Sequence, residues 1–440
     1  MSGERENEFG NKEEIVVETE DREGEAFGEE SYSVQKDGET MSNKRMKEMS
    51  IDRLSALPDG ILLHILSFLD SNVKKAAVTS VLSKRWQFLW SELPKLTFRD
   101  YFWDVGKTRE FVSWVNRTIM LRSESYLKEF QVDFLYDECY ALECIVAPQL
   151  KIEWPCLTRL AFEDVELHDD VIQEILLGCP VLRRLELRHC WGFKRLDVNS
   201  ESLHGLMVYD SKDKSKIDLL EISAPCIRSL DLSFSPVEKK LQLINVQSLV
   251  TADIHFTVCD DSLEVVYTTL ELLQKLQHAE ELILGGVFVE VLSSSVLRGL
   301  RLPQSKRKVL VLETSRDMES IPGILGLLES SPCLDTLLIE SVDSYEEPVR
   351  SWVPAAKNDL ECDLLNLKTV RLLDFADPNH AGEPMLTIAR TLLKRATTLE
   401  KMKIKALGKL TEFASEFTKM SETVLSYPRS SEKAVVGLRP

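Results

Sequence analysis

The chain has 440 residues, a formal net charge of −18 and 44% hydrophobic residues, which is enough apolar material for a sizeable core in two or three domains. The negative charge argues against a nucleic-acid partner, because phosphate binding needs a local excess of Lys and Arg. No apolar run approaches the ~20 residues that span a bilayer, and the first residues do not resemble a signal peptide. We therefore expect no membrane partner and a location in the nucleus and/or cytoplasm.

Residues 1–50 are dominated by Glu, Asp, Gly and Ser and hold few large apolar side chains. Such a segment cannot bury enough apolar surface to offset its ordering entropy. This composition predicts a disordered acidic tail over 1–50.

Residues 57–90 carry more apolar side chains than three short helices can bury among themselves. Pro58 and Asp59 favour a helix start, because proline suits the first turn and a carboxylate stabilises the amino end. A small-residue helix over 73–80 and a third helix capped by Ser83 complete the expected unit. Two apolar rows follow Pro58 at helical spacing: the first is Ile61, Ile65 and Phe68, and the second is Leu62, Leu66 and Leu69. A single buried face of the helix cannot cover both rows.

The third expected helix stacks Trp86, Leu89 and Trp90 together. A unit of this size lies near the lower limit for independent folding, and it has no Cys pair or metal-ligand set to stabilise it. The surplus apolar surface therefore predicts a permanent partner. The alternative is a small helical subdomain that packs against its own chain.

The same stretch resembles an F-box. The segments that carry the resemblance are Leu57-Pro58-Asp59, Ile61-Leu62, Ile65-Leu66-Ser67-Phe68-Leu69, Ser80-Val81-Leu82-Ser83-Lys84-Arg85-Trp86 and Leu89-Trp90. The resemblance implies a three-helix domain over 51–96 that docks on a Skp-type linker protein, which connects it to a cullin and a RING subunit of a ubiquitin ligase. The residues it implies for linker binding are Leu57, Pro58, Ile61, Leu62, Ile65, Leu66, Leu69, Val81, Leu82, Trp86, Leu89 and Trp90.

Within that set, Ile61, Ile65 and Trp86 are the contacts we expect most. Some of Leu62, Leu66, Val81 and Leu89 must close the unit on itself.

From about residue 97 the pattern L-x-x-L-x-L recurs. Its copies start at 127, 157, 182, 203, 227, 249, 279, 334, 367 and 399, and the starts from 157 to 249 lie 25, 21, 24 and 22 residues apart. That spacing is typical of leucine-rich repeats. The last two apolar positions of each copy alternate with polar ones, which predicts a short strand with one buried face. Stacked copies then bury a shared core, as in an irregular parallel solenoid over 97–308.

Helical or irregular segments are expected between the strands, for example at 168–178, where Gly178 is a plausible helix stop, and a helix is expected at 261–277. The alternative fold, a doubly wound α/β enzyme, predicts longer units and a glycine-rich phosphate loop. Gly285-Gly286 alone is too weak a signal for such a loop.

The repeat becomes degenerate over 309–440. There the segments around Leu327-Leu328, Leu367-Lys368-Thr369-Val370 and Leu392-Leu393 resemble the FBD segment of plant F-box/leucine-rich-repeat proteins. The alternative is two or three more solenoid repeats with a capping helix. The expected fold class is thus α/β, with an N-terminal three-helix F-box, an irregular leucine-rich-repeat solenoid and a C-terminal FBD-like cap.

No catalytic motif is present in the sequence. His168-Asp169-Asp170 is better explained as a helix start than as a metal site. The nine Cys residues include no CxxC pair, which indicates reduced thiols. Four of them adjoin a Pro just before a repeat strand and are expected in the core: Cys156, Cys179, Cys226 and Cys333. We predict no catalytic residue, no cofactor and no metal.

A binding face is expected instead, because the third, fifth and seventh positions of each copy point away from the core. Mixed charges on this face suit a protein target better than a polyanion, although solvated polar residues are expected on any strand's outer side. The candidate target-binding residues are Arg159, Arg184, Arg188, Tyr209, Asp231, Asp253 and His255. The same positions nearer the carboxyl end hold Lys401, Lys403 and Lys405.

Together these features predict a non-catalytic substrate adaptor of a Skp-cullin-F-box ubiquitin ligase, which holds a protein target through its repeat face. The alternative is a non-catalytic leucine-rich-repeat scaffold or ligand sensor that acts outside a ligase.

Overall fold

The computed structural model describes residues 54, 56–69, 73–101, 105–120, 127–135, 153–210, 219–237, 240–257, 262–314, 318–341, 360, 362–373, 383–405 and 410–439. The predicted tail at 1–50 lies outside the described residues. Leu57–Pro440 form one compact unit.

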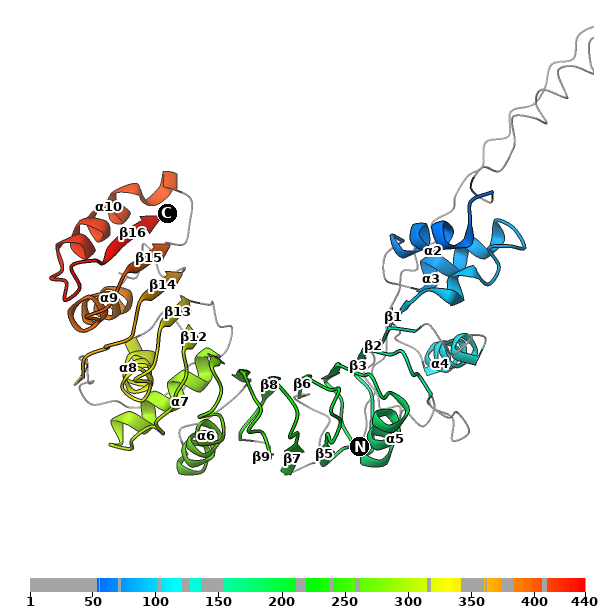
Figure 1. Ribbon diagram of the computed structural model, residues 1–440, viewed down its shortest axis with the longest axis horizontal. Helices are drawn as coiled ribbons and strands as arrows, with labels where there is room; N and C mark the ends of the chain where they lie inside the picture. The colour runs from blue at the N-terminus through cyan, green and yellow to red at the C-terminus, as the bar shows by residue number, and fades with distance from the viewer. Residues whose placement is uncertain are drawn as a thin grey trace, which may run out of the picture. The chain divides into compact units, whose positions relative to one another are not determined.

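One large parallel sheet runs through this unit. Its thirteen strands stand in chain order, and each pairs in parallel with the strand before it (Figure 1). This is how repeats stack in a solenoid, since each unit contacts only its neighbours. The strands are β1 (Lys95–Tyr101), β2 (Glu129–Leu135), β3 (Arg159–Glu163), β4 (Arg184–Arg188), β6 (Gly205–Tyr209), β8 (Ser229–Phe234), β10 (Thr251–Phe256), β11 (Glu281–Leu284), β12 (Val309–Thr314), β13 (Thr336–Ser341), β14 (Thr369–Leu373), β15 (Lys401–Lys405) and β16 (Val435–Arg439).

A second, three-stranded parallel sheet replaces helices in the middle of the chain. It consists of β5 (Arg195–Asp197), β7 (Leu219–Ser223) and β9 (Lys240–Ile244). These strands alternate along the chain with β6, β8 and β10 of the large sheet, so each turn of the solenoid is here made of two strands rather than a strand and a helix.

Each of the ten predicted copies of L-x-x-L-x-L supplies one strand of the large sheet. Three further strands, β1, β12 and β16, were not predicted as copies. Leu93, Leu96 and Phe98 keep the repeat spacing in β1, but the boundary expected at 96/97 falls inside that strand. In β12 the first apolar position is taken by Arg307, as the register with the neighbouring strand shows. Before β16 the buried apolar residue is Ala434, one residue closer to the strand than the repeat spacing requires, and Lys433 is exposed.

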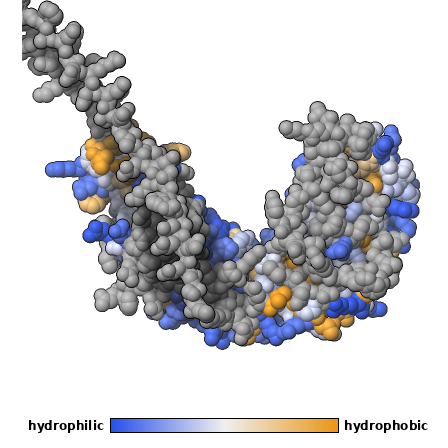
Figure 2. Space-filling view, turned by 180° about the vertical axis from the view of Figure 1, so that it is seen from behind, coloured by the Kyte–Doolittle hydropathy of each residue, from blue (hydrophilic) through white to orange (hydrophobic). Residues whose placement is uncertain are grey.

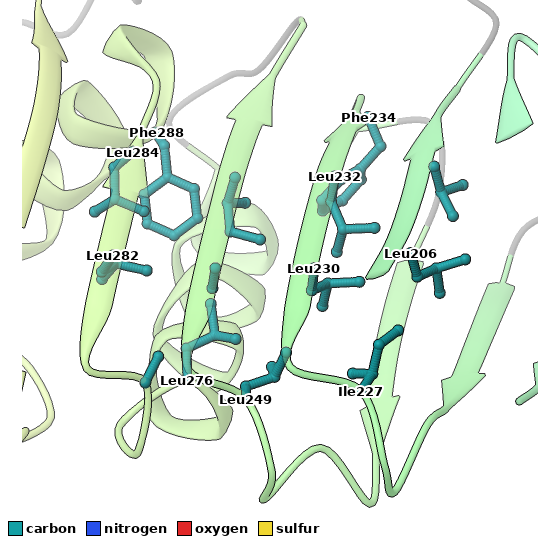
Figure 3. Close-up of a cluster of buried hydrophobic side chains, with 14 of the residues drawn as sticks. Leu206, Ile227, Leu230, Leu232, Phe234, Leu249, Leu276, Leu282, Leu284 and Phe288 are labelled. Atoms are coloured by element: carbon teal, nitrogen blue, oxygen red, sulfur yellow. The ribbon is translucent and has the colours of Figure 1, made fainter. Parts of the chain in front are cut away.

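The apolar rows of the sheet point to the side on which the helices lie. Figure 3 shows this arrangement in the middle of the chain, where Leu282 and Leu284 of β11 lie beside Phe288 of a following helix. All three side chains are fully buried. The helices are α4 (Val105–Met120), α5 (Asp169–Gly178), α6 (Leu263–Lys275), α7 (Gly286–Leu297), α8 (Ile321–Glu329), α9 (Glu383–Arg395) and α10 (Leu410–Ser426).

Helix α5 has the predicted limits, with His168 as its N-cap residue and Gly178 as its last residue. Helix α6 is shorter than the predicted 261–277, because Ser262 caps it: the Ser262 Oγ accepts a hydrogen bond from the Val265 amide at 3.3 Å. None of the helices within the described ranges combines the length and the apolar character that crossing a membrane requires.

The core position predicted for four cysteines is wrong for two of them. Cys179 is buried, whereas Cys156 and Cys333 are exposed and Cys226 is half-buried. Cys156, Cys226 and Cys333 each directly precede the buried first position of a repeat. Their side chains therefore turn away from the core as the chain enters the strand.

Candidate functional site

The N-terminal helical stretch consists of α2 (Asp59–Ser67), α3 (Val73–Val78) and two 3₁₀ turns, η1 (Thr79–Val81) and η2 (Leu89–Glu92). Pro58 is the N-cap of α2 and not its first residue. Asp59 lies in the first turn, where its Oδ1 accepts a hydrogen bond from the Arg85 Nε at 2.9 Å. This ion pair joins the start of α2 to the loop after η1.

The third α-helix predicted from Ser83 does not form. Turns occupy residues 84–88 and lead into η2, and the Ser83 Oγ caps no helix, since it has no hydrogen-bond partner within the described ranges. The Trp90 Nε1 instead donates to the carbonyl of Gln87 at 3.1 Å. Short turns bring both tryptophans into the core, so a continuous helix is not needed to bury them.

Five residues predicted to contact the linker protein are buried in this chain's own core. They are Leu62, Leu66, Trp86, Leu89 and Trp90. This corrects the prediction most clearly for Trp86, which was expected at the contact and is 3% exposed. Some of Leu62, Leu66 and Leu89 were expected to close the unit on itself. They fill the interior between α2, α3 and η2, and a partner cannot reach them without unfolding the stretch.

The other predicted linker contacts lie at the surface. Pro58, Ile61, Leu69, Val81 and Leu82 are exposed, and Leu57 and Ile65 are half-buried. Val81 is 84% exposed.

Phe68, Val78 and Phe88 are exposed as well, although they were not among the predicted contacts. We call these exposed side chains the apolar surface: Ile61, Phe68, Leu69, Val78, Val81, Leu82 and Phe88. Hydrophobic surface gathers over this part of the chain in Figure 2. Monomeric proteins rarely expose so many large apolar residues together unless they bind a partner.

The second candidate surface is the face of the large sheet that points away from the helices. The strand register places the third, fifth and seventh repeat positions in three rows across this face. The seven predicted target-binding residues stand in these rows on the consecutive strands β3, β4, β6, β8 and β10. The structure joins them into two networks.

The first network is built around Glu186 of β4, whose side chain is completely buried. Its Oε1 lies 2.7 Å from the Arg159 Nη2 and 2.8 Å from the Arg184 Nε, and its Oε2 lies 2.9 Å from the Arg188 Nη2. The sequence placed Glu186 on the solvent side of the strand. Three long arginine side chains cover it there, because they flank it on its own strand and on β3.

The arginines themselves keep 30–50% of their side-chain surface exposed. They can therefore still contact a partner. Beyond them, Asp133, Glu163 and Asp164 lie close together. The Arg99 Nε pairs with the Asp133 Oδ2 at 2.7 Å, and burial raises the pKa of both Asp133 and Glu163. We assign no metal to this cluster.

The second network crosses β6, β8, β10 and β12. The Tyr209 Oη donates to the Asp231 Oδ2 at 3.2 Å, and the His255 Nε2 lies 2.8 Å from the Asp253 Oδ1. The His255 Nδ1 lies 3.5 Å from a Glu313 oxygen two strands away. The residue between them on the face is Gly285, whose lack of a side chain leaves room for the imidazole: a Cβ there would lie 2.6 Å from the His255 Nδ1.

Carboxylates dominate this second network. Burial, and then the charge of Asp253, raise the pKa of Asp231. The hydrogen bond to Asp253 raises the pKa of His255, and the charges of Glu313 and Asp231 act in the same direction against the effect of burial. The centre of the face is thus acidic, while the side on β3 and β4 carries the three arginines.

Comparison with known proteins agrees with this architecture. The sequence model of the family described as "At1g61320/AtMIF1, LRR domain" matches residues 139–437. The Arabidopsis thaliana F-box/LRR-repeat protein At5g02910 is 31% identical over 339 residues, which are 66% of this chain and 72% of that protein. The F-box/LRR-repeat protein At3g03360 of the same plant is 27% identical over 448 residues, with 88% of this chain and 90% of that protein covered. The repeat sheet, the match to the LRR model and these relatives agree that the chain belongs to the plant F-box/LRR-repeat family.

Proposed function

We propose that this chain is the substrate-recognition adaptor of a Skp-cullin-F-box ubiquitin ligase. Residues 51–96 are the F-box, which docks on a Skp-type linker protein and through it on a cullin and a RING subunit. The face of the large sheet recruits a protein target, and the FBD-like repeats at 309–440 cap the solenoid. The chain itself is non-catalytic and acts by raising the effective concentration of the target near the ubiquitin-conjugating enzyme.

The observation that supports this proposal best is the apolar surface on a stretch that already has a core. Leu62, Leu66 and Trp86 fill the interior, so Val81 and Leu82 are not needed to hold the fold together. Burying apolar area against a partner stabilises the complex by about 25 cal/mol per Å². Leu and aromatic side chains seated in a groove of the partner would dominate the affinity.

Binding to a purified plant Skp-type linker protein tests the F-box assignment. We expect wild type to bind and the double variant Val81→Glu/Leu82→Glu to lose about 100-fold or more in affinity, because two charges would be buried in an apolar contact. Leu177→Glu is the matched control, since Leu177 is 82% exposed and lies in α5 of the solenoid. Its affinity should equal that of wild type.

Equal affinity of the Val81→Glu/Leu82→Glu variant and wild type, at equal helix content by circular dichroism, would remove the apolar surface from the docking site. No binding by folded wild type would remove the F-box assignment altogether.

A second measurement separates a ligase adaptor from a scaffold that acts outside a ligase. Proteins captured on the full chain are compared with and without a block of cullin activity, and their cellular levels are followed. If the chain is a ligase adaptor, blocking cullin activity raises the cellular level of the captured proteins in cells that carry the wild-type chain. The level does not rise in cells that carry Val81→Glu/Leu82→Glu. A scaffold gives captured proteins whose level does not change.

A further inference from the structure

The face of the large sheet ends in a cluster of cations. On β14, β15 and β16 the three rows of the face hold nine positions, and five of them are Lys or Arg. None of the nine is Asp or Glu. We call the five cations the basic end, and all of them are exposed: Arg371, Lys401, Lys403, Lys405 and Arg439.

The charges of the basic end act on one another. Lys401 lowers the pKa of Lys403, and burial, Arg439 and Arg371 add to the effect. The arginines of β3 and β4 surround a carboxylate, because Glu186 lies within hydrogen-bonding distance of all three. In a chain with a net charge of −18, five cations gathered on three strands form a local positive field that attracts anions.

The width of the basic end limits the length of the anion that can bind to it. Adjacent strands lie about 4.8 Å apart, so three strands cover roughly 10 Å. On the next strands the seventh position of the repeat is Glu340 of β13 and Glu313 of β12. A nucleic-acid backbone that continued along this row would therefore meet carboxylates, and its affinity depends on many phosphate contacts.

The spacing of the cations argues for several separate negative charges. Side chains two apart on one strand lie roughly 6.6 Å from each other. A single phosphate group is compact and could contact only two or three of the five cations. A run of carboxylates in an extended peptide could pair with most of them, because alternate side chains of such a peptide have a similar spacing.

We propose that the basic end binds an Asp/Glu-rich segment of the protein target. This proposal rests on the proposed function in one respect, namely that the bound acidic segment belongs to the protein target of the ligase. The interaction is a set of exposed ion pairs that speeds association and fixes the register of the target on the face. The networks of β3 to β12 then contact less acidic parts of the target.

Fluorescence anisotropy with the full chain and a labelled peptide of alternating Glu and Ser tests the proposal. We expect saturable binding that weakens as salt is raised, and a loss of at least tenfold in affinity in Lys401→Glu/Lys403→Glu, because two attractive contacts become repulsive. The control is Lys275→Glu/Lys419→Glu, which changes the net charge by the same amount on α6 and α10. It should bind the peptide like wild type.

Three results would overturn the proposal. The first is equal peptide affinity of wild type and Lys401→Glu/Lys403→Glu. The second is tighter binding of a single-stranded RNA homopolymer than of the acidic peptide, which would assign a polyphosphate. The third is tighter binding of a singly phosphorylated Gly/Ser peptide than of the acidic one.

The linker-protein assay on the same variants keeps the two proposals apart. Lys401→Glu/Lys403→Glu should bind the linker protein as wild type does, and Val81→Glu/Leu82→Glu should bind the acidic peptide as wild type does. Either surface can therefore fail its test while the other passes.

Discussion

Arg307 is a cationic residue at a position where the repeat otherwise places a buried apolar side chain. It occupies the first apolar position of the β12 repeat, which is Ala279 in the preceding copy and Leu334 in the following one. Its side chain is 1% exposed, and none of its three guanidinium nitrogens has a hydrogen-bond partner among the residues that the structure describes. Burial lowers its pKa to about 10. A buried charge without a partner is costly, so this repeat is less stable than its pattern allows.

Replacing the guanidinium by a hydrocarbon should stabilise the chain. We expect Arg307→Leu to raise the free energy of unfolding by about 1–3 kcal/mol, because the change removes the desolvation cost and restores the repeat's leucine. Urea denaturation followed by circular dichroism measures it. Arg301→Leu, at an exposed position nearby, should change stability by less than about 0.5 kcal/mol. A destabilised Arg307→Leu would show that the guanidinium has a partner in solution.

His255 gives the sheet face a dependence on pH. The hydrogen bond to Asp253 raises its pKa in the folded state above that of the unfolded chain, and Asp231 and Glu313 add to this. A group with a raised folded pKa contributes stability that is fully present below its unfolded pKa and is lost as pH rises through its folded pKa. The relevant window therefore begins near pH 6.5 and extends upward.

We expect His255→Gln to lower the free energy of unfolding more at about pH 6 than at about pH 8, relative to wild type at the same pH. Urea titrations at both pH values measure this difference. His204→Gln, which changes an exposed histidine on the turn before β6, is the control substitution. An equal effect of His255→Gln at both pH values would mean that the imidazole gains no charge interaction on folding.

At the scale of elements, the close contact of α7 and α8 depends on a glycine. The Gly323 amide donates to the Ser293 Oγ at 2.9 Å. A Cβ on Gly323 would lie 2.4 Å from the Val289 carbonyl oxygen and 2.8 Å from the Ser293 Oγ. The backbone of α7 cannot yield at the first contact without moving the helix. The need for glycine at this position comes from Ser293, a neighbour 30 residues away in the chain.

Gly323→Ala should therefore lower the free energy of unfolding by about 1–3 kcal/mol, as overpacking does in other cores. Gly60→Ala is the control, because a Cβ in α2 meets nothing within 4 Å. It should leave stability unchanged or raise it by about 0.5–1 kcal/mol through helix propensity. Thermal unfolding of both variants checks the pair, and equal melting temperatures would show that α7 and α8 can separate slightly.

At the scale of the whole molecule, the large sheet orders charge along the chain. Arginines paired with Glu186 stand on β3 and β4, carboxylates dominate from β8 to β13, and cations return on β14 to β16. Each strand adds one residue to each row of the face. When the charge of these residues changes sign from one group of repeats to the next, the face is therefore divided into regions of opposite charge. A target would meet these regions in chain order, and their sequence would fix its orientation.

The sequence alone was sufficient for ten of the thirteen strands that the described residues form in the large sheet. Ten copies of L-x-x-L-x-L predicted ten strands. A strand with one buried face needs apolar residues at alternate positions, and the stacking of repeats needs a further apolar residue just before the strand. The pattern failed at Arg307, where a cation occupies that first position, and before β16, where the buried Ala434 lies one residue closer to the strand than the repeat spacing requires. Neighbouring strands supply the backbone hydrogen bonds there, so one lost apolar contact does not prevent pairing.

What the sequence determined about this protein is its periodicity and its surplus of apolar residues at 57–90. Only the tertiary structure decided how that surplus divides, with Trp86 and Trp90 inside and Val81 and Leu82 outside. Helical spacing places residues in rows, but the row that faces the core depends on what the rest of the chain packs against it. The same holds for Glu186, which the strand pattern assigns to solvent and three arginines bury. Side chains on neighbouring strands pair only if the strand register brings them together. That register depends on residues that are distant from one another in the sequence.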